Sequence, residues 1–522
     1  MLITLFPALH GERDLPLGLL YIAQTLIEHG YQVRIVDLNL HVGKNIDLGR
    51  ISAIRDADLF GFSSYRYTMS ADISIAWQVR LINDSPMIWG GWGPTTNPLL
   101  YIRYAPADII IPGVHMQAPK VMLDVVKCIE KRRDISIVKG IVYRDGDIIV
   151  DTGLGEIPDR IPPLKWDIIS HVDLALEDYI EDGVLLVPIL GALASCPKYY
   201  ESPCIYCSIG RVISEYKITY GTNRFNELMQ RLMQFDVDRI IQDMENAIVY
   251  FNDVLKDKLK RISFTLVDDA VTPENFLKLY KKLVENGLIN EFSFMKFQTR
   301  PEYIPKILKN IRREHRSKFI MDVGFEFFSE RDLLFTNRGS NPNMLANILR
   351  ELSEKRVHWT GYVILATPVT TAEDLEKNIN LAINIAYNSD LLRCNPYLLE
   401  EDTYIPLKYG WKAIEWKCIK IYSEHGQVTV VVPHRPRFFI GNKEIERMIK
   451  VIDYYIEKVE KLREKAFQKA SKIIAERGEI DLNDSIGTVT RVYSLGELRD
   501  SLMKLRKALV EDYISKERHK AF

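Results

Sequence analysis

Three of the six cysteines in this 522-residue chain fall within twelve positions. Cys196, Cys204 and Cys207 follow the apolar run Gly183–Ala194, which predicts a buried strand that ends in a loop. Sulfur ligands favour zinc, copper(I) or an iron–sulfur cluster. A closed zinc or iron–sulfur site usually takes four protein ligands, so three cysteines leave one coordination position for another group.

The composition, with 47% hydrophobic and 27% charged residues, is that of an ordinary globular protein, and the length suggests about three domains. Lys and Arg (69) nearly balance Asp and Glu (70), so no overall field attracts nucleic acid or an anionic membrane. The other cysteines, Cys128, Cys394 and Cys418, are scattered and do not suggest a secreted disulfide framework. The N-terminus lacks the basic segment of a signal peptide, and the run before Cys196 is too short to span a bilayer. We therefore expect a cytoplasmic protein.

Residues 1–115 alternate strand-like and helix-like segments, which predicts a doubly wound parallel sheet. The expected strands are Leu2–Phe6, Val33–Val36, Leu59–Phe62, Met87–Trp89 and Ile109–Ile111. Ligands bind such sheets at the loops after the strands, and glycines there let the backbone approach a ligand closely. These loops contain Ser63, Ser64, Gly90, Gly91 and Gly113. On the glycines alone, tight strand–helix turns without a ligand are an equal alternative.

This region resembles the N-terminal cobalamin-binding domain of the B12-dependent radical SAM enzymes. The resemblance rests on Leu15–Leu20, the strand that ends in Asp37, Gly90-Gly91 and Gly113. It implies a Rossmann-like domain and cobalamin contacts from Ser63, Ser64 and the three glycines. The Asp-x-His-x-x-Gly motif of the methionine synthase type is absent, and His10, His29 and His41 are not placed to replace it. Cobalamin is then expected to bind without a histidine on cobalt, unless the domain has lost the cofactor.

A connector follows the first domain. It contains a predicted helix, Lys120–Glu130, a hairpin at Ile141–Val150 turned at Asp145-Gly146, and a proline-rich stretch up to Leu164. The expected divisions are a cobalamin-binding-like domain over 1–130, a linker over 131–182, a core over 183–410 and a C-terminal domain over 411–522.

The core alternates strands and helices again, in about six units, which predicts a partial (β/α)6 barrel with its chemistry at the carboxyl ends of the strands. The expected strands after the first are Arg261–Val267, Phe292–Phe297, Phe319–Phe328, Gly361–Ala366 and Leu391–Leu398. Asp269 and Arg300 follow two of these strands, and Glu326 lies within an apolar run, where a buried carboxylate needs a partner.

The core resembles the radical SAM barrel of the same family. Asp268-Asp269 is similar to its acidic strand-end motif, Gly324-Phe-Glu326 to Gly-x-Glu-Ser, and Leu365–Asp374 to Gly-x-Pro-Gly-Glu-Thr with both glycines replaced. Glu401-Asp-Thr403 stands near the usual place of Pro-Gly-Thr. The resemblance implies SAM contacts from Asp269, Arg300, Glu326 and Thr367, with Tyr206 at the adenine. For each residue a structural salt bridge or cap is an alternative.

The cysteine spacing is C-x7-C-x2-C, whereas the common family pattern is C-x3-C-x2-C. Four extra loop residues add well under about 1 kcal/mol of closure entropy, so the three thiolates can still converge on one cluster. The alternatives are a zinc site completed by His171 or Cys394, and a redox Cys-x-x-Cys pair, which leaves Cys196 unexplained.

The resemblance implies a four-iron–four-sulfur cluster on the three cysteines, with SAM on the iron that they leave free. Reduction by a ferredoxin-type or flavodoxin-type partner then cleaves SAM to a 5′-deoxyadenosyl radical, and methylcobalamin delivers a methyl group to the substrate radical. The leading hypothesis is methylation of an unactivated carbon. The alternatives are ring formation or carbon–carbon coupling by a radical SAM enzyme with the same domains, and a non-catalytic corrinoid- or metal-binding protein with a structural zinc.

After Trp411 the pattern changes to strand-like runs such as Val428–Val432, and then to helices. Ile445, Ile449, Ile452 and Ile456 recur at helical spacing, and a second helix fits Ser494–Lys516. A packing role for this mostly helical region is favoured over substrate or partner binding.

Overall fold

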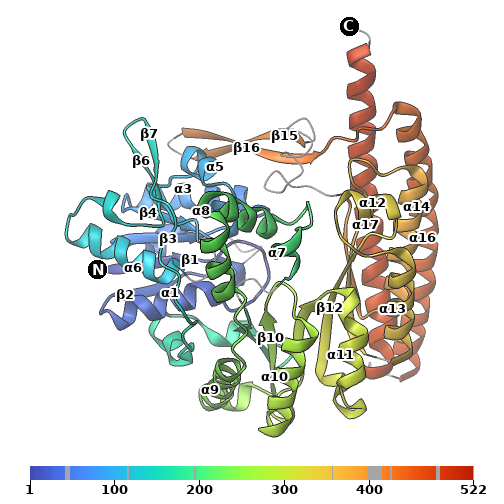
Figure 1. Cartoon of the computed structure of the whole chain (residues 1–522), viewed down its shortest axis with the longest axis horizontal. Coiled ribbons are helices and arrows are strands. Elements are labelled where there is room, and N and C mark those ends of the chain that lie inside the picture. The colour runs from blue at the N-terminus through green and yellow to red at the C-terminus, as the bar shows by residue number, and fades with distance from the viewer. Residues whose placement is uncertain are drawn as a thin grey trace.

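The computed structural model describes residues 1–41, 47–113, 117–192, 196–355, 357–397, 414–423, 426–477 and 482–520. Within these residues, two seven-stranded sheets and their covering helices form most of the molecule, as Figure 1 shows. No helix in these ranges is both long and apolar enough to cross a membrane.

The N-terminal sheet has the strand order β2-β1-β3-β4-β5-β6-β7. The strands are β1 (Leu2–Phe6), β2 (Gln32–Ile35), β3 (Leu59–Ser63), β4 (Met87–Gly90), β5 (Ile109–Ile110), β6 (Val142–Asp145) and β7 (Ile148–Asp151). The first five run parallel, and the β6–β7 hairpin extends the sheet antiparallel. The predicted doubly wound domain is confirmed, and the predicted hairpin joins its sheet.

Helices cover both faces of this sheet, which is why its strands are apolar on both sides. One face packs on α1 (Leu17–Glu28) and α6 (Gln117–Glu130) through residues such as Leu20 and Val125. The other face packs on α3 (Met69–Ile82) and α5 (Pro98–Tyr104) through residues such as Ile73 and Tyr101. The loops after β1, β3 and β4 leave the sheet at one edge, and the order β2-β1-β3 places a crevice between the first two of them.

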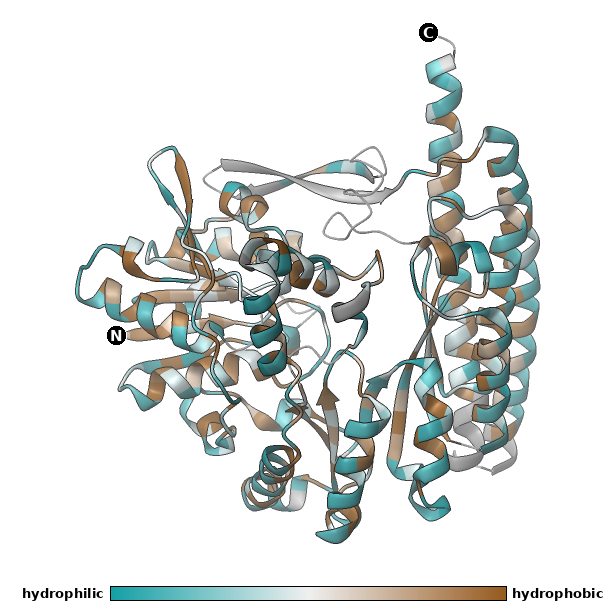
Figure 2. Cartoon of the chain, viewed as in Figure 1, coloured by the Kyte–Doolittle hydropathy of each residue, from teal (hydrophilic) through white to brown (hydrophobic). Residues whose placement is uncertain are grey.

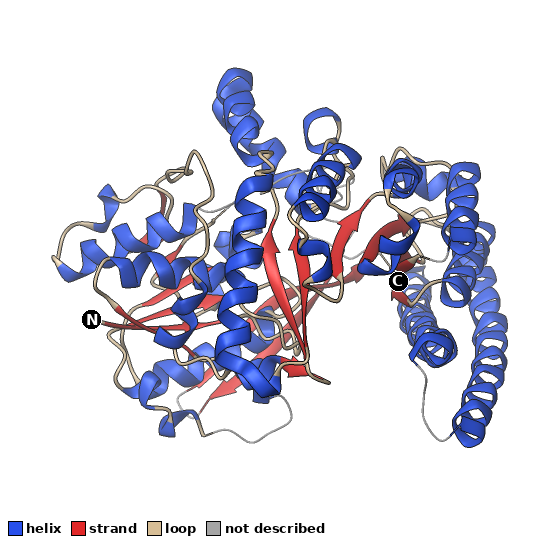
Figure 3. Cartoon of the chain, turned by 90° about the horizontal axis from the view of Figure 1, so that it is seen from below, coloured by secondary structure: helices blue, strands red, loops and turns tan. Residues whose placement is uncertain are grey.

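The second sheet has the order β14-β13-β12-β11-β10-β9-β8, as Figure 3 shows from below. Its strands are β8 (Ile180–Glu181), β9 (Val184–Leu190), β10 (Arg261–Val267), β11 (Met295–Thr299), β12 (Phe319–Glu326), β13 (His358–Ile364) and β14 (Leu391–Asn395). In the described residues the last six run parallel. They alternate with α8 (Ser208–Leu232), α9 (Val237–Leu255), α10 (Pro273–Glu285), α11 (Ile304–Asn310), α12 (Glu330–Phe335), α13 (Pro342–Lys355) and α14 (Ala372–Asn388). The predicted partial (β/α)6 barrel is confirmed as a curled, open sheet.

Helix α8 begins immediately after Cys207, so the last of the three clustered cysteines stands at its N-terminus. Gly221, with φ +74°, breaks the helix in its middle, so the two halves bury different faces and share no common stripe. Phe225 and Met229 of the second half are buried, as are Val212 and Ile213 of the first.

The C-terminal region consists of a hairpin, β15 (Ile414–Ser423) with β16 (Gly426–Pro436), and two long helices, α16 (Asn442–Arg477) and α17 (Leu482–Lys520). The hairpin reaches back to α3 and α5 of the first domain. The helices pair with each other and pack on α14 and β14. Figure 2 shows apolar residues along the strands, and α16 and α17 bury apolar side chains such as Ile452, Leu498 and Leu502.

Helix α17 covers the free edge of β14. Ser494 Oγ accepts a hydrogen bond from the amide of Leu392 at 3.0 Å, and Glu497 Oε1 accepts one from the amide of Cys394 at 2.7 Å. Ser501 Oγ donates to the carbonyl of Cys394 at 2.6 Å. These side chains satisfy backbone groups that an open edge strand leaves unpaired.

Candidate functional site

The three clustered cysteines lie between β9 and α8 and are largely buried. Cys207 is the N-cap of α8, where its Sγ accepts a hydrogen bond from the amide of Gly210 at 3.3 Å. Burial raises the pKa of the Cys207 thiol to about 12, and it also raises the pKa of Cys196. Cys204 adds to both pKa shifts, so the thiols are electrostatic neighbours. The positive charge of a bound metal centre is what converts such thiols to thiolates.

The side chains are not arranged as a compact site for a single ion. Among the described residues, no group of three or more His, Cys, Asp or Glu side chains is placed to hold one metal ion.

A chain of polar groups leads from the cysteines to Asp269. The Cys207 thiol donates to the Tyr199 hydroxyl across 3.8 Å, and Tyr199 hydrogen-bonds to the Asp269 carboxylate. Burial, and then the neighbouring Asp268, raise the pKa of Asp269 to about 8. Among the described residues, Asp269 Oδ2 is buried without a hydrogen-bond partner. A buried acceptor of this kind is ready for a donor from a bound ligand.

Asp268 has a different environment. Its Oδ2 accepts from the amide of Ala192 at 3.1 Å, and its Oδ1 accepts from the amide of Ala270 at 3.3 Å. It thereby joins the end of β9 to the end of β10, so its role is to position the loop that carries Asp269.

Two buried arginines, Arg300 and Arg338, lie within electrostatic reach of the cysteines. Arg300 donates through Nη2 to the carbonyl of Arg338 at 3.0 Å and pairs with Glu302. Burial raises the pKa of Glu326, whereas Arg338 and Arg300 oppose that rise. Arg338 and Arg300 therefore supply positive charge within electrostatic reach of Glu326.

Glu326 has φ +63° and lies at a register shift where β12 leaves β13. A glutamate in the left-handed region is strained and is a frequent mark of a functional position. Tyr206, which follows Ile205 in the cysteine loop, is within electrostatic reach of Arg338, Glu326 and Cys204. The structure thus brings Tyr206, Arg300 and Glu326 together around the cysteines.

Tyr199 and Arg338 were missed by the sequence reasoning. Arg338 lies in the segment between α12 and α13, away from the strand ends where the sequence predicted site residues. Among the described residues its Nε is buried without a hydrogen-bond partner. Because a buried carboxylate needs a partner, the sequence indicated that a cation lies near Glu326. It did not indicate which arginine supplies that charge.

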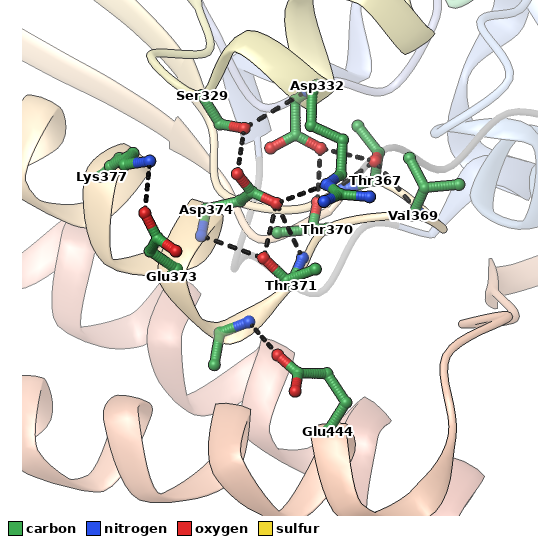
Figure 4. A network of polar contacts seen from close by, with 12 residues as sticks. Ser329, Asp332, Thr367, Val369, Thr370, Thr371, Glu373, Asp374, Lys377 and Glu444 are labelled. Atoms are coloured by element: carbon green, nitrogen blue, oxygen red, sulfur yellow. Dashed lines mark hydrogen bonds and ion pairs between the residues drawn. The ribbon is translucent and has the colours of Figure 1, made fainter.

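Thr367 lies in a separate polar network (Figure 4). Its hydroxyl donates to Asp332 Oδ1 at 2.7 Å, and its amide donates to Thr370 Oγ1 at 2.6 Å. Asp332 also accepts from Asn378 of α14 at 2.9 Å. These bonds hold the β13–α14 turn and occupy the Thr367 hydroxyl, so a SAM contact through this residue stays a prediction. The nearby prediction at Glu401-Asp-Thr403 lies outside the described residues.

The first domain contributes the opposite wall of a cavity of about 1930 Å³. Ser63, Gly90, Gly91 and Gly113 line it, whereas Ser64 lies beneath the surface with its hydroxyl bound within the fold. Gly91 has φ +91°, and a Cβ there would lie 2.7 Å from the carbonyl oxygen of Ser64. Among the three glycines predicted to contact cobalamin, Gly91 is therefore the one where a side chain would clash most closely with the backbone.

The same cavity extends to Asp268 and Asp269 at the barrel, next to the cysteine loop. Between these ends, Lys296, Tyr362 and Arg393 project into it from the inner face of the barrel. Asp322 Oδ2 pairs with Lys296 Nζ at 3.1 Å and accepts from the Tyr362 hydroxyl at 3.3 Å. The volume exceeds the roughly 300–1,000 Å³ of a typical small-ligand pocket, so a large cofactor and a substrate fit together.

The surroundings fit the groups that the resemblance implies. Gly18 lines the cavity and faces open space, with no atom within 4 Å of a Cβ placed there, which leaves room for a bulky ligand against bare backbone. The soft sulfur donors suit an iron–sulfur cluster, and the unpaired oxygen of Asp269 suits an ammonium group.

Comparison with known proteins agrees with this architecture. Residues 14–118 match the family model of the B12 binding domain. An uncharacterized methyltransferase, PH0819 of Pyrococcus horikoshii, is 23% identical over 380 residues, which cover 71% of this chain and 74% of that protein.

Two solved structures have a similar fold. The radical S-adenosylmethionine methyltransferase TsrM from Kitasatospora setae, with tryptophan substrate and aza-SAM bound, matches with a TM-score of 0.55 and 14% identity, over 86% of this chain and 88% of that chain. The cobalamin-dependent S-adenosylmethionine radical enzyme OxsB, with aqua-cobalamin and S-adenosylmethionine bound, matches with a TM-score of 0.59 and 12% identity, over 100% and 81%. The predicted B12-binding domain and the predicted resemblance in fold to cobalamin-binding radical SAM enzymes are confirmed.

Proposed function

We propose that this protein is a cobalamin-dependent radical SAM enzyme that methylates an unactivated carbon of a polar substrate. The observation that carries the proposal is the single cavity that joins the glycine loops of the B12-binding domain to Asp269 beside the three cysteines. A reaction that uses two cofactors on one carbon requires both to face one enclosed space.

The residues on the two sides of the cavity bind different cofactors. Cys196, Cys204 and Cys207 hold the cluster, Asp269 binds the ammonium of SAM, and Arg338 and Arg300 bind its carboxylate. Tyr206 lies against the adenine, and the glycine loops hold cobalamin. Once bound, the cluster and SAM supply a 5′-deoxyadenosyl radical that takes a hydrogen atom from the substrate, and cobalamin supplies the methyl group.

The residues of the barrel interior favour a polar substrate. Lys296, Asp322 and Tyr362 form one hydrogen-bonded group, and Arg393 Nη1 lies 3.9 Å from Glu497 Oε2 of α17. Charged side chains that pair with each other keep a fixed geometry and leave further donors and acceptors for a ligand. A hydrocarbon-like substrate would displace water from these charged groups without replacing its hydrogen bonds, which costs binding energy.

Anaerobic purification with cobalamin, followed by counting of iron, sulfide and corrinoid per chain, tests the cofactor set. We expect four irons, four sulfides and one corrinoid, and production of 5′-deoxyadenosine when SAM and a low-potential electron carrier of ferredoxin or flavodoxin type are added. One zinc without iron, and no 5′-deoxyadenosine, would refute the enzyme and favour a metal-binding protein.

Isotope-labelled SAM methyl then tests the reaction type. The label is expected in the product. A product formed with 5′-deoxyadenosine but without label would refute methyl transfer and support ring formation or carbon–carbon coupling on the same scaffold.

A further inference from the structure

Asp72 connects loops that are distant in the sequence. It lies in the first turn of α3, and only 3% of its surface is exposed. Its Oδ1 accepts a hydrogen bond at 2.9 Å from the amide of Leu9, in the loop after β1. Its Oδ2 accepts from the hydroxyls of Ser64 and Thr68, each at 2.6 Å, in the loop after β3.

The connection continues to the loop after β4. The Ser64 hydroxyl lies 2.9 Å from the hydroxyl of Tyr101 in α5, and the Ser64 carbonyl accepts from the amide of Gly93 at 2.9 Å. The Tyr101 hydroxyl occupies the space beside Gly93, where a Cβ would lie only 2.1 Å from it. One buried carboxylate therefore holds three loops, directly or through Ser64.

These three loops form the B12-domain wall of the cavity. Asp72 does not line the cavity itself, but residues on each side of its partners do: Pro7, Ala8 and His10 in the first loop, Ser63 and Tyr65 in the second, and Gly90, Gly91 and Trp92 in the third.

Helix capping does not account for this arrangement. A residue in the first turn of a helix needs at most the local bond from Thr68, which is the N-cap of α3. The bond from Leu9 spans 63 residues of sequence, and the bond from Ser64 reaches a different strand end. Burial, opposed by these hydrogen bonds, raises the pKa of Asp72 to about 6, so a costly buried carboxylate is retained at this position.

We infer that Asp72 is a positioning residue for the cobalamin site, which fixes the loops after β1, β3 and β4 relative to one another before the cofactor binds. This inference rests on the proposed function. Loops that are fixed in advance lose less conformational entropy on binding, so the benefit appears as affinity.

Through the loop after β1, Asp72 also affects the substrate end of the cavity. It also carries Glu12 and Asp14, which enter the mouth of the barrel. Asp14 is within electrostatic reach of Lys296, and Glu12 is within reach of Tyr362. The loop that Asp72 holds at Leu9 therefore contributes to both the cofactor wall and the substrate end of the cavity.

Titration of the full-length protein with hydroxocobalamin, followed by absorbance, tests the inference. We expect Asp72→Ala to weaken hydroxocobalamin binding at least about tenfold, since it removes the acceptor for three donors. Asp72→Asn keeps an acceptor for Leu9 but turns an amide toward Ser64 and Thr68, so a smaller loss is expected. SAM affinity, measured on the reconstituted protein, should be unchanged in both variants.

Asp108→Ala is the matched control. Asp108 accepts from the amide of Met87 at 2.7 Å and pairs with Arg80 at the other end of the same sheet, so it stabilises the domain without touching the three loops. Asp108→Ala should bind hydroxocobalamin like the wild type. If Asp72→Ala does not fold, Asp72→Asn decides, because it preserves shape and removes the buried charge.

The outcomes separate the two proposals. A wild-type protein that does not bind hydroxocobalamin would overturn the proposed function. A wild-type protein that binds it, with both Asp72 variants binding within twofold, would overturn the role of Asp72. An equal loss in Asp72→Ala and Asp108→Ala would also overturn it, because general destabilisation would then explain the effect.

Discussion

Arg338 donates a hydrogen bond through Nη2 to the carbonyl oxygen of Gly324, 2.5 Å away. This bond fixes the guanidinium beside Glu326, and a Cβ at Gly324 would lie 3.3 Å from Arg338 Nη2 and 2.6 Å from Glu326 Oε1. Gly324 therefore makes room for both charged groups. The family resemblance predicted Gly324 and Glu326 as site residues. The structure adds Arg338, whose guanidinium lies beside both.

Arg338→Lys should weaken SAM binding about tenfold, because a lysine keeps the charge but cannot bind a carboxylate through two parallel hydrogen bonds. Calorimetric titration of the reconstituted protein with SAM measures the effect, with the iron content expected to stay unchanged. Arg331→Lys is the control, since Arg331 is an exposed arginine of α12 that pairs with Asp374. Equal SAM affinity in Arg338→Lys and the wild type would exclude Arg338 from the SAM site.

Cys196→Ala should reduce iron and sulfide to a small fraction of the wild-type content, since the cluster loses one of three ligands. Cys394→Ser is the comparison, because Cys394 is a buried cysteine on β14 that was considered as a fourth zinc ligand. We expect Cys394→Ser to retain full iron content. If instead Cys394→Ser lost metal and Cys196→Ala kept it, the cysteine assignment would be wrong.

Gly91→Ala should lower cobalamin affinity more than tenfold, because the new Cβ would lie 2.7 Å from the carbonyl oxygen of Ser64 and move the loop after β4. Gly30→Ala provides a matched control: Gly30 also has a positive φ, +85°, but nothing lies within 4 Å of a Cβ there. Both variants carry backbone strain, and Gly91→Ala alone carries the clash. Similar corrinoid affinities in the two variants would show that the loop does not contact the cofactor.

His358 gives a pH-dependent contribution to stability. Its hydrogen bond with Asp390, 3.2 Å from Nδ1, raises the pKa of His358 above its ordinary value of 6.5. A raised histidine pKa in the folded protein stabilises the fold below pH 6.5, and this contribution disappears as the pH rises through the folded-state pKa. His358→Gln should therefore lower the unfolding temperature more at pH 6 than at pH 8.5.

Asp390→Asn should reduce the difference between these two pH values, because it removes the partner that raises the pKa. An unfolding temperature of His358→Gln that differs from the wild type by the same amount at both pH values would contradict the assignment.

The parallel strands were the most predictable part of the fold. Leu2–Phe6 and Arg261–Val267 were predicted with the bounds that the structure shows, since strands covered by helices on both faces appear as short, mostly apolar runs. Helix α9 (Val237–Leu255) was not predicted, although its apolar residues recur at helical spacing and bury Ile240, Met244 and Phe251.

Residue roles were less predictable than elements. Ser64 and Thr367 were predicted as site residues because they stand at strand ends, but their hydroxyls donate to buried carboxylates instead. Ser64 donates to Asp72, eight residues later, and Thr367 donates to Asp332, 35 residues earlier. Asp72 and Arg338 were missed because their partners, Leu9 and Gly324, come from other loops and strands. Which polar side chains meet is decided by tertiary packing, which local patterns do not encode.

The cover that α17 provides for β14 has a consequence during synthesis. Leu392 receives its partner Ser494 only after a further 102 residues have been made. At about 5–20 residues per second, the open edge of the barrel stays uncovered for roughly 5–20 s on the ribosome. During that interval the nascent chain exposes a strand edge that can pair with another chain, so the yield of native protein should depend on translation speed through the last hundred codons and on chaperones that occupy the edge meanwhile.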